Sequence, residues 1–294
     1  MAVFLVCEYA IDNRVLDQLV VQRNGLAVQI ALAGGSTGLG AIRNYLQQRT
    51  SGDVAISVRD RDYDYTLAEA ATTWTAPTSR QLVWRRHEIE NYLLEPLVVL
   101  DLFNEWRALP NAAWASGLPG SEAGAESLLQ RLAVPLIPEH VAGLVRTELV
   151  RTMNALGSLS FTHPTAAPPP GAALGAAGWR AAVVAEAARL ASSGTALAAL
   201  PGLDAATIGA RYDALLAGCR SVQFFAAREY LRDMGGKELL AALAQHLNGL
   251  GAPGRLNSTA IADALLRALV RIYQPNTLFQ PDDFAELGAI LAQF

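Results

Sequence analysis

Near its N-terminus the chain reads VFLVCEYAIDNRVLDQLVV (residues 3–21). Its first five residues form a continuous apolar run, which is typical of a short strand buried on both faces of a parallel sheet. From residue 12 to residue 21, four apolar side chains recur at the spacing of one helical face. The stretch therefore predicts a strand followed by a helix, the repeating step of an α/β fold.

The same alternation continues to about residue 100. Apolar runs at residues 26–33, 53–58 and 81–84 predict further strands, and residues 39–46 predict a helix. Strands joined by short helical connections pair mostly in parallel. We expect residues 1–100 to form an α/β domain whose parallel sheet is flanked by helices.

Residues 101–294 have a different pattern, in which helical periodicity dominates. A stretch rich in proline, alanine and glycine at residues 162–178 predicts a linker or surface loop, and residues 110–120 also read as a loop. Ser258 and Asp282 are suited to cap helix N-termini. We therefore expect a mainly α-helical second region. The helices expected from residue 97 onward are 97–106, 179–191, 205–216, 237–247, 258–273 and 282–293.

The composition indicates an ordered protein that does not enter a membrane. Of the 294 residues, 52% are hydrophobic and 17% are charged, a balance that excludes a disordered chain. The mean hydropathy is +0.22, but the most apolar stretch, residues 172–203, is mostly alanine and is interrupted by charged residues. The N-terminus lacks the basic segment of a signal peptide. Cys7 and Cys219 are isolated, which favours buried, reduced thiols, so we expect a cytoplasmic protein.

The charge balance limits how the chain could contact nucleic acid. A net charge of −4 predicts no broad basic surface. Any contact would have to be local or mediated by a metal. Lys237 is the single lysine of the chain, which otherwise uses arginine.

Carboxylates follow two of the predicted strands. Glu8 stands at the end of the first strand, and Asp12 opens the helix after it. Asp60 and Asp62 follow the third strand, where two residues apart in an extended segment would point to the same side. If the first and third strands are neighbours, all four carboxylates meet at the edge where open parallel sheets bind ligands. Each alone reads as a solvated loop residue, but together they predict a hard divalent cation, Mg²⁺ or Mn²⁺.

Three other motif interpretations fail. The stretch GGSTGLG (residues 34–40) lacks the Gly-Lys-Ser/Thr of a nucleotide-binding P-loop. Its glycine spacing matches the cofactor loop of short-chain dehydrogenases, but their Tyr-x-x-x-Lys pair is absent, because the position four before Lys237 is Asp233. The acidic run at residues 60–64 lacks the glycine and glutamate that a calcium-binding EF-hand loop needs at its sixth and twelfth positions.

The order of these motifs resembles the TOPRIM domain, the Mg²⁺-binding fold of topoisomerases, DnaG-type primases, RecR and the OLD-family nucleases. The resemblance rests on Glu8 after the first strand, Gly-Gly after the second, and Asp60-x-Asp62 after the third. The spacing from Glu8 to Asp12 is similar to the OLD-type branch. Tyr9 departs from that pattern, because it stands where the family has glycine.

Two further blocks resemble a TOPRIM-like family of unknown function that is encoded beside, or fused to, ABC-type ATPases. This family includes the nuclease effector of the PARIS anti-phage system. The first block is HEIENYLL (residues 87–94), and the second, a late Gly-Lys block, is GGKELL (residues 235–240). Apart from that late block, the resemblance covers roughly residues 1–100.

The resemblance implies a role for each acidic residue. Glu8, Asp12, Asp60 and Asp62 would hold one or two Mg²⁺ or Mn²⁺ ions that activate water for phosphodiester cleavage. Glu8 could instead act as the general base. Glu90 would complete the metal shell, whereas Glu88 is better explained as a carboxylate at a helix start.

The resemblance also assigns the basic residues. Lys237 would be a catalytic group that faces the scissile phosphate. Arg85 and Arg86 would contact the nucleic-acid backbone. A basic pair at a strand edge is also an ordinary feature of soluble sheets.

Together these assignments predict a metal-dependent TOPRIM endonuclease that acts as a toxin effector in anti-phage defence with an ABC-type ATPase. The PARIS comparison suggests RNA such as tRNA as the substrate, and the OLD comparison suggests DNA. The protein could work as a homodimer. The alternative is a non-catalytic TOPRIM-like subunit that scaffolds or regulates the ATPase, for which Tyr9 is the best support.

Overall fold

A computed structural model describes residues 2–75, 80–110, 113–154, 174–192, 202–273 and 282–294. The chain forms two compact units, of which the first combines Met1–Leu129 with Leu231–Phe294 and the second is Gln130–Tyr230. This division differs from the predicted boundary near residue 100, because the C-terminal helices return to the N-terminal unit.

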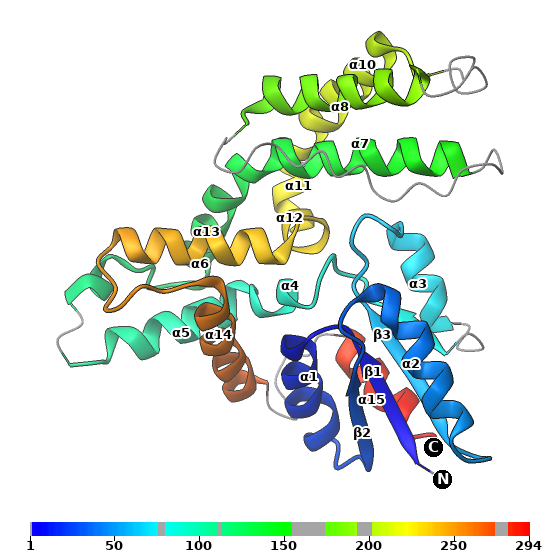
Figure 1. The fold of residues 1–294 in the computed structure, drawn as a ribbon. Coiled ribbons are helices and arrows are strands. Elements are labelled where there is room, and N and C mark those ends of the chain that lie inside the picture. Colours follow the sequence, from blue (N-terminus) through cyan, green and yellow to red (C-terminus); the bar gives the residue numbers. More distant parts are fainter. Residues whose placement is uncertain (1, 76–79, 111–112, 155–173, 193–201, 274–281) are drawn as a thin grey trace. The chain divides into compact units, whose positions relative to one another are not determined.

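The first unit is built on a four-stranded parallel sheet with the order β2-β1-β3-β4 (Figure 1). Its strands are β1 (Val3–Cys7), β2 (Val28–Leu32), β3 (Val54–Arg59) and β4 (Gln81–Val83). In β1, Val3 lies opposite Val28 of β2 and opposite Val54 of β3. The prediction of an α/β fold with a parallel sheet is confirmed, and the condition for the acidic edge, that the first and third strands are neighbours, is met.

Helices connect the strands, and two of the three lie where the apolar pattern predicts them. After β1, α1 (Ala10–Leu16) continues into η1 (Asp17–Gln22), a wider π-helical segment. After β2 comes α2 (Ser36–Gln48), and after β3 comes α3 (Leu67–Thr75), which the sequence analysis did not predict.

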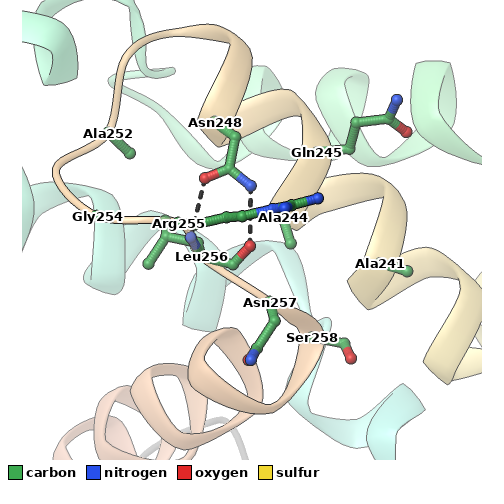
Figure 2. A pocket seen from close by; sticks show the side chains of 10 residues that line it. All are labelled: Ala241, Ala244, Gln245, Asn248, Ala252, Gly254, Arg255, Leu256, Asn257 and Ser258. Atoms are coloured by element: carbon green, nitrogen blue, oxygen red, sulfur yellow. Dashed lines mark hydrogen bonds between the residues drawn. The ribbon is translucent and has the colours of Figure 1, made fainter.

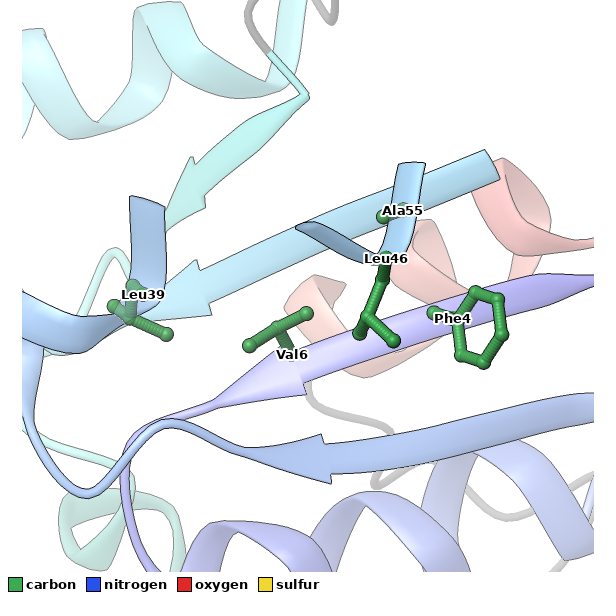
Figure 3. Packing of buried hydrophobic residues seen from close by; sticks show 5 residues of the cluster. All are labelled: Phe4, Val6, Leu39, Leu46 and Ala55. Atoms are coloured by element: carbon green, nitrogen blue, oxygen red, sulfur yellow. The ribbon is translucent and has the colours of Figure 1, made fainter. Parts of the chain in front are cut away.

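The core under α2 shows how the strand pattern specifies the layers. Figure 3 shows Phe4 and Val6 of β1 packed with Ala55 of β3 against Leu39 and Leu46 of α2. Because side chains alternate along a strand, the remaining apolar residues of β1 face the opposite side. A strand that is apolar on both faces thus has a helical layer to bury each of them.

The C-terminal helices complete the first unit. The helix α15 (Asp282–Leu291) packs against η1. A Cβ atom on Gly288 of α15 would lie 2.9 Å from the side-chain nitrogen of Asn24, so α15 and the Asn24 side chain approach closely at this glycine. The helix α14 (Ser258–Ile272) packs on α5 (Pro96–Arg107) and on α13 (Gly236–Gly249), and both α13 and α14 contact the short α4 (Glu90–Leu93).

The second unit is helical. In it α10 (Ala205–Cys219) packs on α7 (Ile137–Asn154) and α8 (Ala176–Ser192), and the hydroxyl of Tyr212 donates to the carbonyl of Pro138 at 3.1 Å. The remaining helical elements of the whole chain are η3 (Ala113–Gly117), α6 (Glu122–Ala133), η4 (Val134–Leu136), α11 (Val222–Ala226) and α12 (Glu229–Asp233). Most of the predicted loop at residues 162–178 lies outside the described residues, and its last residues already belong to α8.

Several smaller predictions can be compared with the structure. Helices occur at all six predicted places from residue 97 onward, so the mainly helical second region is confirmed. The cap of α14 is Asn257, not Ser258, because the Asn257 side chain accepts from the backbone nitrogen of Ala260 at 2.8 Å. Cys7 and Cys219 are buried, and among the described residues neither forms a disulfide. In the described residues, no helix is long and apolar enough to cross a membrane.

Candidate metal centre

The ends of β1 and β3 bring two predicted site residues together. Glu8 follows β1 and Asp60 follows β3, and each is 3% exposed. The backbone nitrogen of Asp60 donates to Oε1 of Glu8 at 3.2 Å. Burial raises the pKa of the Glu8 carboxyl group. Burial and the charge of Asp12 raise the pKa of Asp60 well above its usual range.

Asp12 faces the same edge from the first turn of α1. Its Oδ2 atom accepts from the backbone nitrogens of Glu8 (3.0 Å) and Tyr9 (2.8 Å), which caps the helix. In the described part of the chain, its buried Oδ1 atom has no hydrogen-bond partner. Burial raises the pKa of Asp12 to about 6. Oδ2 therefore stabilises the start of α1, and Oδ1 is available to a ligand.

Asp62 lies near Glu8 and Asp60, with a backbone conformation that the sequence did not predict. We call the acidic residues at this edge, together with His87, the cluster; its members are Glu8, Asp12, Asp60, Asp62, His87, Glu88 and Glu90. The expected extended segment ends before it, because Asp62 has a left-handed backbone with φ of 44°. Its backbone nitrogen donates to the carbonyl of His87 at 2.9 Å. Burial, followed by the negative charge of Glu88, raises the pKa of Asp62 to about 6. The intervening Arg61 pairs instead with Asp233, at 2.6 Å.

The segment after β4 supplies Glu90. The backbone nitrogen of Ile89 donates to Oδ1 of Asp60 at 3.1 Å, which ties the start of α4 to the end of β3. Glu90 is 5% exposed, and its Oε2 atom is buried without a partner among the described residues. Burial and the charge of Glu88 raise the pKa of Glu90 to about 7. Glu90 interacts electrostatically with Asp12 and Asp60, but among the described residues the ligand atoms that lie within 4.8 Å of one another are those of Asp62, His87 and Glu88.

Lys237 comes to the cluster from a distant part of the chain. Its Nζ atom lies 2.8 Å from Oε1 of Glu88 and 3.7 Å from Oδ2 of Asp60. Its backbone nitrogen donates to Oε2 of Glu88 at 2.9 Å. Burial opposes the ammonium charge, but the neighbouring carboxylates outweigh this and raise the pKa of Lys237. Glu88 therefore pairs with Lys237, a role that the sequence did not predict.

Asn91 is the residue that joins these two segments. Its Oδ1 atom accepts from the backbone nitrogen of Glu88 at 2.8 Å, and its Nδ2 atom donates to the carbonyl of Met234 at 2.9 Å. It is fully buried. A buried amide with both ends satisfied holds the two backbones in one register, since breaking either bond leaves an unpaired polar group.

His87 is a site residue that the sequence analysis left without a role. Ligand atoms of Asp62, His87 and Glu88 all lie within 4.8 Å of one another, close enough to hold a metal ion. His87 is 4% exposed, and its ring lies against the ring of Tyr63 with centroids 4.5 Å apart. Its position in the block HEIENYLL, directly before Glu88, was the available signal.

Tyr9 lies at the border of the cluster. It is 46% exposed, and its ring centroid is 5.7 Å from Nζ of Lys237. A Cβ atom on Gly35 would lie 3.3 Å from the Tyr9 hydroxyl, and Gly35 also has a positive φ of 133°. Tyr9 is thus accommodated between the glycine turn and the lysine.

Arg85 and Arg86 do not join the cluster. Arg85 pairs with Asp283 and Glu286 of α15, and Arg86 pairs with Glu95. Tyr92 also donates to Asp283. Both guanidinium groups therefore hold elements of the first unit together, and their placement gives no support to the predicted contact with nucleic acid.

A separate cavity lies along α13 and the loop to α14. Its volume is about 800 Å³. Figure 2 shows Asn248 holding this loop through two hydrogen bonds to the backbone of Leu256, with the side chain of Arg255 beside them. None of the cluster carboxylates lines this cavity.

The donors in the cluster fit a hard divalent cation. They are carboxylate oxygens, which suit Mg²⁺ or Mn²⁺, with the imidazole of His87, a ligand type that zinc and other transition metals also take. The unpartnered oxygens of Asp12 and Glu90 are both buried, where an unsatisfied acceptor is costly. Burial is the main cause of the raised pKa values of Asp12, Asp62 and Glu90, and the negative charges of neighbouring acids add to it. No family model and no curated protein matches this sequence.

Proposed function

We propose that the protein is a divalent-metal-dependent nuclease that cleaves phosphodiester bonds in RNA, such as tRNA, or in DNA. The observation that carries the proposal is the pair of buried oxygens, on Asp12 and Glu90, that have no partner in the described residues and that interact electrostatically with Lys237, the only lysine of the chain. Buried carboxylates with free acceptor atoms favour a cation, and a nearby ammonium group favours a phosphate.

The residues that would hold Mg²⁺ or Mn²⁺ are the carboxylates at the carboxyl ends of β1 and β3, together with Glu90. When bound, such an ion supplies an activated water and charge stabilisation for phosphoryl transfer. Glu8 has a raised pKa, so its carboxylate can accept a proton nearer neutral pH than an ordinary glutamate. Lys237, with 45% of its side chain exposed, can offer its ammonium group to a phosphate oxygen.

The proposed partner and biological role rest on the two sequence blocks that resemble the family encoded with ABC-type ATPases. In this protein the two blocks contribute Glu88 and Lys237, which form an ion pair within the cluster. We propose an effector of anti-phage defence that acts in the cytoplasm with such an ATPase. Co-purification of the full chain with an ABC-type ATPase encoded beside it tests this part.

The nuclease assay uses the full chain with end-labelled tRNA, an RNA oligonucleotide and plasmid DNA, in Mg²⁺, in Mn²⁺ and in EDTA. We expect metal-dependent cleavage that falls about a hundredfold or more in Glu8→Gln and Asp60→Asn. Asp53→Asn is the matched control, since Asp53 directly precedes the first residue of β3, at the end of the strand away from Asp60. Its carboxylate accepts hydrogen bonds from the Thr50 hydroxyl and the backbone nitrogen of Ala2. Cleavage that survives in Glu8→Gln and Asp60→Asn would contradict the assignment.

A non-catalytic regulatory or scaffold subunit is the second candidate. The placement of Tyr9 favours it, because the ring occupies the space between the glycine turn and Lys237. If the wild type is inert with and without its ATPase while Tyr9→Gly cleaves, the tyrosine blocks a competent site and the second candidate stands. If Tyr9→Gly is no more active than a cleaving wild type, the nuclease assignment stands.

A further inference from the structure

Lys237 already supplies positive charge to the cluster before any metal binds. Its ammonium group lies 2.8 Å from Glu88 and 3.7 Å from Asp60. The nearby arginines make their ion pairs elsewhere, Arg59 with Asp64 and Arg61 with Asp233. Among the described residues, the Lys237 ammonium group is thus the cation in direct contact with Glu88 and Asp60.

The two attachments of residue 237 to Glu88 differ in how easily they break. The backbone nitrogen is fixed by the first turn of α13 and binds Oε2 of Glu88. The ammonium group stands at the end of a flexible side chain that is 45% exposed, and it binds Oε1. The ammonium group can therefore leave without moving the helix.

A divalent cation would need the atoms that the lysine now contacts. Glu88 is one of the three residues, with Asp62 and His87, whose ligand atoms lie within 4.8 Å of one another. Both carboxylate oxygens of Glu88 are engaged by residue 237. An ion bound by Glu88 or by Asp60 would also place two positive charges within a few ångströms, where they repel.

We propose that Lys237 is the internal counter-cation of the metal-free centre, and that a divalent cation displaces its ammonium group from Glu88 and Asp60. This inference rests on the proposed metal site. The displaced ammonium group is then free to bind a phosphate. Metal binding and phosphate binding are thereby coupled through one side chain. Without metal, the lysine stays bound to Glu88 and Asp60.

The first test measures metal affinity by calorimetric titration of Mn²⁺ and of Mg²⁺ at pH 8. Lys237→Met keeps most of the length of the side chain and removes the charge, so both metals should bind about tenfold more tightly or better than in wild type. Lys237→Arg keeps the charge and should remain close to wild type. Thermal unfolding without metal reports whether each variant is folded.

The second test uses the fact that the chain has one lysine. An amine-selective acylating reagent can modify only Lys237 and the terminal α-amino group, and peptide mass spectrometry separates the two. Mn²⁺ or Mg²⁺ should accelerate acylation of Lys237 severalfold relative to the α-amino group, which serves as the internal reference. Glu90→Gln, which lacks one proposed ligand, should show a smaller acceleration.

The outcomes separate this inference from the proposed function. If the metals bind wild type but Lys237→Met binds no more tightly and acylation does not change, the counter-cation role is wrong and the metal site stands. If neither metal binds wild type or Lys237→Met, both the inference and the proposed function are wrong. Tighter binding to Lys237→Met with metal-accelerated acylation supports the inference.

Discussion

A Cβ atom on Gly236 would lie 2.9 Å from the backbone nitrogen of Asn91 and 2.9 Å from its Oδ1 atom. The start of α13 therefore lies directly against the segment that opens α4. This approach sets the next residue, Lys237, on Glu88. Gly236 is thus a structural requirement of the candidate metal centre.

Gly236→Ala should damage both stability and metal binding. The atoms in the way include backbone, so α13 must shift, and we expect a loss of about 1–3 kcal/mol in the free energy of unfolding. Urea denaturation and metal titration measure the two effects. Gly249→Ala is the matched control in the same helix, because a Cβ atom there meets nothing within 4 Å. Equal behaviour of the two variants would show that the close approach does not matter.

The glycines of α2 give a second matched pair. A Cβ atom on Gly38 would lie 2.4 Å from the carbonyl oxygen of Ala33, whereas one on Gly40 meets nothing within 4 Å. Gly38→Ala should therefore destabilise the protein, and Gly40→Ala should be neutral or stabilising by up to about 1 kcal/mol, since alanine favours helix. Thermal and urea unfolding check both. If Gly40→Ala lowered the free energy of unfolding and Gly38→Ala did not, the packing described for this turn would be wrong.

Three acids of the candidate metal centre predict how stability depends on pH. Asp12, Asp62 and Glu90 have pKa values raised to about 6, 6 and 7 in the folded protein. Between their ordinary values, near 4, and these raised values, the folded state binds more protons than the unfolded state. The free energy of unfolding of the metal-free protein should therefore fall as the pH rises from about 4 to about 7, by roughly 1–3 kcal/mol for each group.

Urea denaturation across this pH range, with and without Mg²⁺, measures the dependence. Mg²⁺ should restore stability above pH 7, because it compensates the ionised carboxylates. Glu90→Gln should flatten the fall, since the amide does not titrate. Stability of the metal-free wild type that rises steadily from pH 4 to pH 7 would show that these carboxylates are not strained by burial.

The sequence was sufficient for the sheet and its acidic edge. The apolar run before Glu8 and the one before Asp60 each specify a strand buried on both faces, and parallel pairing then brings their ends together. The positions of Glu8 and Asp60 could be predicted because each directly follows the strand that positions it. The same reasoning failed at Asp62, since a left-handed residue other than glycine leaves no clear mark in the sequence.

What the sequence could not supply were contacts between distant segments. The pairing of Lys237 with Glu88 spans 149 residues and depends on Asn91 and Gly236, which carry no charge pattern. Arg85 read as a surface contact because Asp283, its partner, lies 198 residues away. The predicted boundary near residue 100 had the same cause, since no local pattern shows that α13, α14 and α15 return to the first unit.

The most direct test of the metal centre is an anomalous diffraction measurement on crystals of the full chain grown with Mn²⁺. The account predicts an anomalous peak at roughly 2.0–2.3 Å from carboxylate oxygens at this edge. Asp12, Asp60 and Glu90 should be among its ligands, and the ammonium group of Lys237 should have moved away from Glu88. Well-ordered density with no anomalous peak at this edge, and with Lys237 still bound to Glu88, would contradict it.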